Sequence, residues 1–463
     1  MGTNKGPETF DQAVEVYAAP TPARERLGML FDAGTFVELD RFSAVEEEPC
    51  GVVCGYGAVN GSLVCAFAQE GGGMGRTQAA KIAKLYDLAL KTGVPVVGVY
   101  DSAGARVSEG VAALEAYGEV LLRINNLSGV VPQIALVLGG CTGTSAMLAC
   151  SADFVVMDQN ATFFMTPPAL AEDTVDDAGW AANAAKAGVA HLVAESPEQA
   201  CSQVRKMLSY LPANNLAACP AVDYTAPQAD LATGNYEDAD PAALAEAILD
   251  TGSLIELLGE FGSGAYTALG TLEGASVGVA SGKGKLTADS CAKIAKMVSV
   301  CDAFQIPVIT LVNAAGFEPS AKAELCGSVR EMAKLGHVYA EATTPKMAVI
   351  TGKAYGAAYV ALASRAANSD YTAAWPDTII SALEPQTAVA FLHADEISAE
   401  RSREDVLQDY LTQVASPLAV AKAGYLDDVI QPGETRTALL RALEILSAKR
   451  VSKNPKKHGN LPM

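Results

Sequence analysis

Apolar residues follow two different patterns along this chain. Short continuous apolar runs indicate strands, and apolar residues three to four positions apart indicate helices. The apolar run at 63–68, bordered by polar and glycine-rich segments, is typical of a buried strand. Residues 77–93 carry isoleucine, leucine and alanine near helical spacing and end in a glycine, which predicts a capped helix. Valine-rich 94–102 and apolar 132–140 indicate two more buried strands. Strands that alternate with helices in this way predict an α/β fold with short crossover connections.

The same order of elements returns in the second half of the chain. The word AKIAK occurs at 80–84 and again at 292–296, each time in a helical passage that leads to a proline and an apolar strand. PQIALVLGGCTGTS begins at 132, and PKMAVITGKAYGAA occupies the matching place from 345. Because these matches keep their order and spacing, we interpret the chain as a tandem duplication.

Its length agrees with two full domains. The chain has 463 residues, and a typical domain needs roughly 100–200. Residues 217–243 are rich in proline, alanine and aspartate and are expected to form the linker. We therefore predict an N-terminal domain at 1–225 and a C-terminal domain at 226–463. An amphipathic helix is expected at 437–450, followed by a basic tail.

Charge and cysteine usage narrow the class of function. Half of the residues are hydrophobic and the formal net charge is −20, which argues against nucleic acid as a partner. No apolar run approaches the ~20 residues of a membrane span, and the first residues lack the apolar core of a signal peptide, so a cytoplasmic protein is expected. Ten cysteines without a CxxC pair and four dispersed histidines favour no metal site.

The best candidates for chemistry are two small-residue turns at matching places in the repeats. GGCTGTSA (139–146) and GKAYGAAYVA (352–361) each follow an apolar strand where a helix is expected to begin. Such a turn exposes backbone N–H groups at a helix N-terminus, which suits an anion or a carbonyl oxygen that develops negative charge. Close packing of helix on strand explains one such turn equally well, but two matched turns favour function. Neither turn carries a GxSxG elbow or a P-loop.

These passages resemble the carboxyltransferase subunits of biotin-dependent acyl-CoA carboxylases and decarboxylases, of the propionyl-CoA carboxylase β and methylmalonyl-CoA decarboxylase α type. The resemblance begins at ARERLGMLFDAGTFVELD (23–40) and continues through LKTGVPVVGVYDSAGARVSEG (90–110). It includes CDAFQIPVITLVNAAGF (301–317) and EATTPKMAVITGKAYGAAYVAL (341–362), and ends at KKHGNLPM (456–463). It thus covers nearly the whole chain, with its motifs in order.

The resemblance implies two tandem ClpP/crotonase-like domains, each a ββα spiral. The N-terminal domain would bind acyl-CoA, and the C-terminal domain would bind biotin carried on a separate protein, the biotin carboxyl carrier protein. The implied reaction moves a carboxyl group between biotin and the α-carbon of a short acyl-CoA, propionyl- or methylmalonyl-CoA. Further implied partners are a biotin carboxylase or sodium-pumping decarboxylase subunits, and the implied assembly is a homodimer to homohexamer with active sites between copies.

The family's functional positions transfer onto particular residues. The N-terminal oxyanion hole falls on Gly143 and Thr144, and the C-terminal one on Gly356, Ala357 and Ala358. The substrate-binding positions implied by the resemblance are Ser102, Ala103, Gly104, Arg106 and Val360. Arg106 is expected to contact CoA phosphates or to form a salt bridge that holds its turn.

Several positions depart from the family pattern. The segments after AFAQ and GVAS are shorter than usual, Asn313 replaces an aspartate, and Val360 stands where propionyl-type enzymes often have aspartate. Two other functions stay open at this point. One is a biotin-independent crotonase-type hydratase, isomerase or hydrolase, for which Glu109 is the candidate acid or base. The other is a non-catalytic assembly subunit.

Overall fold

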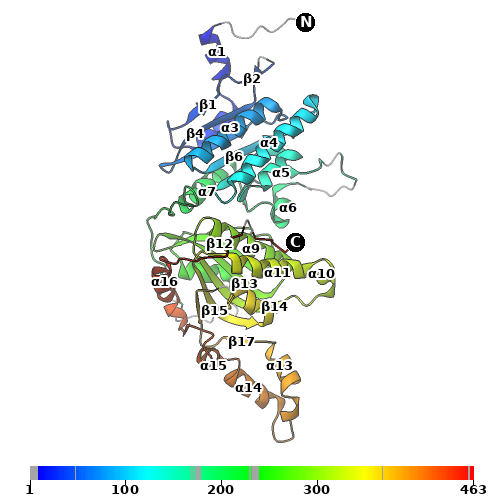
Figure 1. Ribbon diagram of the computed structural model, residues 1–463, viewed down its shortest axis with the longest axis vertical. Coiled ribbons are helices and arrows are strands. Elements are labelled where there is room, and N and C mark those ends of the chain that lie inside the picture. Colours follow the sequence, from blue (N-terminus) through cyan, green and yellow to red (C-terminus); the bar gives the residue numbers. More distant parts are fainter. Residues whose placement is uncertain are drawn as a thin grey trace. The chain divides into compact units, whose positions relative to one another are not determined.

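The chain divides into two compact units, Met1–Pro220 and Ala221–Met463. The computed structural model describes residues 9–46, 48–167, 170–172, 179–228, 231, 239–367, 369–456 and 459–462. The expected linker therefore lies partly outside the described residues, and the expected boundary at 225 falls a few residues after the division. Figure 1 shows the first unit in blue to green and the second in green to red.

The first unit is built on one mixed sheet. Its strand order is β1-β4-β5-β6-β7-β8-β10, and β9 pairs with β7. Strands β1, β4 and β5 are antiparallel neighbours, whereas β5 to β8 and β10 run parallel. The strands are β1 (Val37–Leu39), β4 (Val52–Val59), β5 (Ser62–Gln69), β6 (Val96–Ser102), β7 (Gln133–Thr142), β8 (Phe154–Asp158), β9 (Thr162–Phe164) and β10 (Leu192–Ala194). The predicted buried strands thus become the centre of this sheet.

Helices α3 and α4 lie side by side on this sheet (Figure 1). Helix α3 ends where Gly93 adopts a left-handed conformation (φ 64°), as the glycine cap predicted. The helices of the unit are α1 (Phe10–Tyr17), α2 (Pro22–Leu30), α3 (Arg76–Thr92), α4 (Val111–Leu127), α5 (Thr144–Cys150), α6 (Ala181–Lys186) and α7 (Pro197–Tyr210). A short turn of 3-10 helix, η1 (Val107–Glu109), precedes α4, and β2 (Ala44–Val45) pairs with β3 (Glu48–Pro49).

The second unit repeats this topology strand for strand. Its order is β11-β12-β13-β14-β15-β16-β18, and β17 pairs with β15 as β9 pairs with β7. The strands are β11 (Ile255–Glu256), β12 (Ala265–Leu272), β13 (Ala275–Leu286), β14 (Val308–Phe317), β15 (Lys346–Tyr355), β16 (Tyr371–Ala374), β17 (Ile379–Ser381) and β18 (Asp428–Val429). The helices that match those of the first unit are α8 (Pro241–Ile248), α9 (Ala288–Ala303), α11 (Ser328–Glu341), α12 (Gly356–Leu362) and α16 (Thr435–Leu446). The predicted α/β fold with two repeated domains is confirmed.

The repetition extends to single hydrogen bonds. Lys81 and Lys293, the first lysines of the two AKIAK words, are both buried and donate to the carbonyls of Val52 (2.8 Å) and Phe261 (3.0 Å). An aliphatic stem packs in the core while the ammonium group finds a backbone oxygen at its end. The repeated word is therefore explained by packing of the helix on its sheet.

An arm of helices distinguishes the second unit. Helices α13 (Pro385–Leu392), α14 (Arg403–Gln413) and α15 (Pro417–Lys422) lie between β17 and β18. Figure 1 shows α13 and α14 in orange, away from the sheet. They pack around a small core of their own that includes Val389, Val406 and Tyr410. The duplicated sequence did not predict this arm.

Candidate functional site

Two glycine turns lie together at the carboxyl ends of β6 and β7. These strands are parallel neighbours, and Ser102 pairs with Cys141 at their ends. Gly104 (φ 92°) and Gly143 (φ 57°) both adopt positive φ, a region that disfavours a side chain. A Cβ on Gly104 would lie 3.2 Å from the carbonyl oxygen of Thr142, so the two turns approach closely. The structure thus brings the predicted Ser102–Gly104 and Gly143–Thr144 segments to one place.

A buried chain of hydroxyl groups fixes these turns. The Tyr117 hydroxyl lies 2.6 Å from the Ser145 hydroxyl, which donates to the hydroxyl of Ser102 (3.0 Å). Ser102 in turn donates to the carbonyl of Gly72 (3.3 Å) and accepts from the N–H of Gly104 (3.2 Å). Burial raises the pKa of Tyr117, so its hydroxyl stays protonated and able to donate. Ser102, a predicted substrate contact, therefore has a positioning role in its turn.

The turn before α5 presents donors at the start of a helix. The N–H of Gly143 is engaged, because it donates to the carbonyl of Phe164 at 2.7 Å. Thr144 and Ser145 begin α5, where a helix has no earlier carbonyl for its first N–H groups. The positive φ of Gly143 thus turns the chain into α5. The N–H of Thr144, the first residue of that helix, is the next backbone donor.

The second unit carries the matching pair of turns. Gly316 (φ 102°) ends β14 beside β15, and Gly356 (φ 54°) begins α12. Ala357 is exposed and Ala358 is buried in the first turn of that helix. Gly316 is not among the predicted site residues, although the repeat aligns it with Gly104. That alignment was the signal that could have found it.

Arg106 and Glu109 are paired with each other next to the first turn. Arg106 Nη1 lies 3.5 Å from Glu109 Oε1, the salt bridge that was one of the two expectations for this arginine. The other oxygen of Glu109 accepts from the backbone N–H of Arg76 (2.8 Å), the first residue of α3. A carboxylate at a helix N-terminus is stabilised there. The structure therefore gives Glu109 a capping role, which disfavours it as a general acid or base.

Other predicted positions lie at the surface. Ala103 is exposed in its turn, and Val360 lies on α12 with 55% of its surface exposed. Within the described part of the chain, no three His, Cys, Asp or Glu side chains gather as a metal site. A search of the same residues finds no helix long and apolar enough to cross a membrane.

The comparison with known proteins decides the family. The model of the carboxyl transferase domain matches residues 20–461, almost the full chain. The chain belongs to the carboxyl transferase family. The predictions of this family and of a carboxyltransferase enzyme are confirmed.

Relatives with established names cover most of this carboxyl transferase. A propionyl-CoA carboxylase beta chain from Saccharopolyspora erythraea is 38% identical over 492 residues, covering 95% of this chain and 90% of that relative. A methylmalonyl-CoA decarboxylase subunit alpha from Veillonella parvula is 36% identical, and the match covers 95% of this chain and 93% of that relative. Carboxylase and decarboxylase components are thus similarly close.

A solved structure supports the same assignment. The crystal structure of transcarboxylase 12S, described as a hexamer with methylmalonyl-coenzyme A and methylmalonic acid bound, matches with a TM-score of 0.89. The match is 32% identical and covers 98% of this chain and 95% of the other. The two repeated sheets of this carboxyl transferase are therefore crotonase-like domains, as the resemblance implied.

Proposed function

We propose that this carboxyl transferase moves a carboxyl group between biotin on a separate carrier protein and the α-carbon of a short acyl-CoA, propionyl- or methylmalonyl-CoA. The observation that carries the proposal is that each unit has a pair of matched turns, with one positive-φ glycine in each turn, at the ends of adjacent parallel strands. The names of the relatives support the substrate class and the dependence on biotin.

In the first unit, the turn at Gly143 is assigned to the thioester carbonyl. When the α-proton leaves the acyl-CoA, negative charge develops on the thioester oxygen. The N–H of Thr144 and the positive end of α5 would stabilise that charge without a charged side chain. The hydroxyl chain from Tyr117 to Ser102 holds these donors in place before the reaction begins.

In the second unit, the turn at Gly356 is assigned to biotin. Biotin, when bound, supplies the carboxyl group and takes up the α-proton. Its ureido oxygen is an acceptor, and the first-turn N–H groups at Ala357 and Ala358 are donors, so the residues present fit it. Ala357 and Ala358 carry only a methyl group, and Ala357 is exposed.

Exposed apolar side chains in both units support an assembly of several copies. Val107 and Val111 are 90% and 71% exposed beside the first pair of turns, and Leu325 and Val329 are 90% and 56% exposed in the second unit. Exposed apolar patches of this kind mark protein interfaces. The proposal is a homodimer, or a larger assembly up to a hexamer, in which the first unit of one copy meets the second unit of another. A biotin carboxyl carrier protein, with a biotin carboxylase or sodium-pumping subunits, would complete the enzyme.

The test is carboxyl transfer by the purified protein. Methylmalonyl-CoA or malonyl-CoA is incubated with free biotin or a biotinylated carrier domain, and loss of the carboxyl group is followed by mass spectrometry. Decarboxylation that depends on biotin is the expected result. Turnover that persists without biotin would instead establish a crotonase-type enzyme. Binding of CoA without turnover under either condition would point to an assembly subunit.

A further inference from the structure

We propose that Tyr410 and Ser381 are positioning residues for the turn at Gly356, and that the helical arm of the second unit holds this turn in place for biotin. The inference rests on the proposed function, which assigns the turn to the ureido oxygen of biotin. Tyr410 lies on α14 in the arm, and Ser381 is the last residue of β17. Both side chains are buried, and their hydroxyl oxygens lie 2.8 Å apart. This hydrogen bond joins the arm to β17.

Strand β17 borders the turn at Gly356. Ser381 pairs with Tyr355, the residue directly before Gly356. A Cβ on Gly356 would lie 3.2 Å from the carbonyl oxygen of Ala382, so the backbone that follows Ser381 passes close to the turn itself. A shift of β17 would therefore displace the turn, together with the backbone donors at the start of α12.

The arm is attached to β17 at two neighbouring points. The backbone N–H of Ile380 donates to the carbonyl of Ala415 at 2.9 Å, next to the hydrogen bond of Ser381. The N–H of Ala415 in turn donates to the carbonyl of Tyr410 at 3.1 Å. Tyr410 is also part of the small core of the arm, and the ring of His393 lies against it with centroids 5.8 Å apart. The position of Tyr410 is therefore fixed by the packing of the arm.

The first unit fixes its turn with different hydroxyl groups. Those of Tyr117, Ser145 and Ser102 form the buried chain described above. The repeat places Ala358 where the first unit has Ser145, and Ala314 where it has Ser102. Because alanine offers no hydroxyl group, the second unit cannot form this chain at the equivalent positions.

The position of Ser381, conversely, has no hydroxyl group in the first unit. Ser381 pairs with Tyr355 in the second unit, and Phe164 pairs with Thr142 at the equivalent place in the first. Tyr410 comes from the arm, which distinguishes the second unit. Each turn is thus held through a buried tyrosine hydroxyl bonded to a serine, but the tyrosine and serine come from different elements in the two units.

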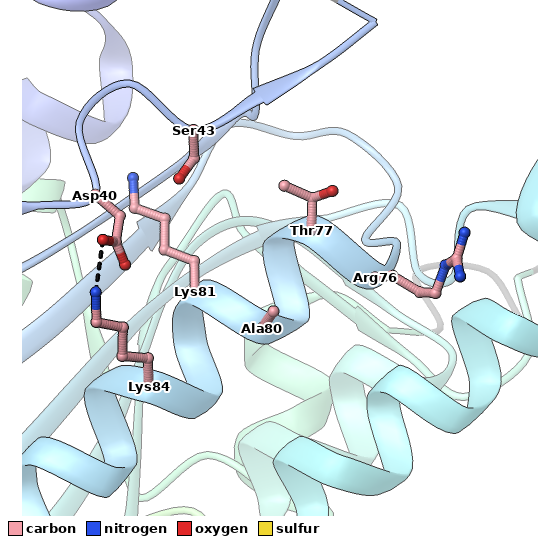
Figure 2. A pocket seen from close by; sticks show the side chains of 7 residues that line it. All are labelled: Asp40, Ser43, Arg76, Thr77, Ala80, Lys81 and Lys84. Atoms are coloured by element: carbon pink, nitrogen blue, oxygen red, sulfur yellow. Dashed lines mark hydrogen bonds and ion pairs between the residues drawn. The ribbon is translucent and has the colours of Figure 1, made fainter.

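The burial of this hydrogen bond makes it a firmer attachment than an exposed ion pair. Lys84 on α3 lies 2.6 Å from Asp40 in the loop after β1, the contact that Figure 2 marks with a dashed line. Their side chains are 62% and 32% exposed, and such a solvated pair contributes little. Removal of the Tyr410 hydroxyl would instead deprive a buried serine of its hydrogen bond, which costs more.

The test compares the removal of a hydroxyl group from two buried tyrosines of the second unit. Y410F removes the hydroxyl that reaches Ser381. Y339F is the matched control, because the Tyr339 hydroxyl lies 2.8 Å from that of Thr310, near the beginning of β14 and away from the turns at its end. S381A removes the partner of Tyr410 without changing the core of the arm. Steady-state kinetics with methylmalonyl-CoA and free biotin give kcat and both KM values, and calorimetry gives Tm.

Y410F and S381A should each lower kcat by about tenfold, because the donors at the start of α12 no longer meet the charge that develops on biotin. The double variant should lose no more than either single variant, since both remove the same hydrogen bond. The KM for methylmalonyl-CoA should stay unchanged, because the turn at Gly143 is untouched. Y339F should keep kcat within about twofold of wild type, even where its Tm falls.

Two results would contradict the inference in different ways. If S381A or a folded Y410F has the same kcat as Y339F, the arm does not position the turn, and the proposed function is unaffected. If the wild-type protein shows no carboxyl transfer that depends on biotin, the proposed function fails and the inference fails with it.

Discussion

At equivalent positions of the two units, the same type of backbone hydrogen bond is accepted by a charged side chain in the first unit and by a neutral one in the second. In the first unit, Asp101 accepts from the N–H of Gly140 (3.2 Å) and pairs with Arg26 at 2.8 Å. In the second unit, Asn313 accepts from the N–H of Lys353 (2.9 Å), and Leu244 stands at the place of Arg26. A largely buried carboxylate needs a cation, whereas an amide does not. The backbone geometry is thus common to both units, and the charges differ in matched pairs.

Other positions show the same contrast between a shared backbone geometry and different charges. Positive-φ glycines and buried lysines occur at equivalent places in both units. Arg76 and Thr77 of the first unit, in contrast, align with Ala288 and Asp289 of the second unit. What is repeated is the backbone geometry of the turns and the packing of the helices on their sheets, and what differs is the charge at the start of α3 and α9.

The largest effects are expected at the glycines of the two turns. Gly143→Val and Gly356→Val force a β-branched residue into a positive-φ conformation and displace the donors that follow. Each variant should lose carboxyl transfer by about 100- to 1000-fold, the loss expected for an oxyanion hole. Steady-state kinetics measure the loss, and circular dichroism should show the fold retained. Near-normal activity in one folded variant would remove that turn from the site.

Two ion pairs, each between the last helix of a unit and the connection that follows α2 or α8, should differ in strength. Arg436 binds Asp250, which is buried, as Arg205 binds the more exposed Asp32; both distances are 2.7 Å. Asp250→Asn should lower the free energy of unfolding by about 3 kcal/mol, because it leaves Arg436 without its charge partner. Asp32→Asn should cost about 1 kcal/mol, since that pair is better solvated. Urea unfolding near pH 7 measures both.

The same carboxylates predict a dependence on acid. Burial alone would raise the pKa of Asp250, but hydrogen bonds from Gly274, Thr271 and Arg436 outweigh it, and the net pKa is lowered. Hydrogen bonds from Gly61 and Arg205 lower the pKa of Asp32. Their stabilisation is therefore present above the ordinary pKa near 3.8 and is lost as the pH falls through the lowered values. If Asp250→Asn leaves the acid dependence unchanged, this explanation is wrong.

Substitution can convert the charged pair of the first unit, Arg26 and Asp101, into the neutral pair of the second unit. Arg26→Leu, which copies the second unit, leaves Asp101 without its cation and should destabilise the protein by about 2 kcal/mol. Adding Asp101→Asn should recover most of this loss, since the pair then matches Leu244 and Asn313. A double-mutant cycle by thermal unfolding measures the coupling. Additive losses would contradict the idea that the two residues changed together.

The smallest effect is expected at a buried lysine that replaces a glutamine of the other unit. Lys346 donates to the carbonyls of Tyr339 and Ala342, whereas the aligned Gln133 donates to Ile124. Burial lowers the pKa of Lys346 to about 8, below its ordinary value of 10.5. Between these values the unfolded chain binds more protons, so stability should rise with pH. Lys346→Gln should flatten that rise by about 1 kcal/mol, measured as Tm from pH 7 to 9. An unchanged rise would mean that another group titrates.

Much of this organisation could be predicted from the sequence, because it depends on local spacing and on repetition. The strands, the helix that ends at Gly93 and the turns at Gly143 and Gly356 follow from apolar pattern and small residues. The hydroxyl chain could not be predicted, since Tyr117, Ser145 and Ser102 come from three elements that only the fold brings together. For the same reason, the sequence offered Glu109 as a catalytic candidate, whereas the structure places it at the start of α3.

The most direct test of the central claim is complementation between the two units. Gly143→Val and Gly356→Val chains are co-expressed with different tags, the mixed assembly is isolated, and biotin-dependent carboxyl transfer is measured against each parent. If each site combines the first unit of one copy with the second unit of another, a mixed dimer contains one site with both turns intact. The isolated mixed dimer should then have about half of wild-type activity, although both parents are nearly inactive. A mixed assembly as inactive as its parents would contradict the account.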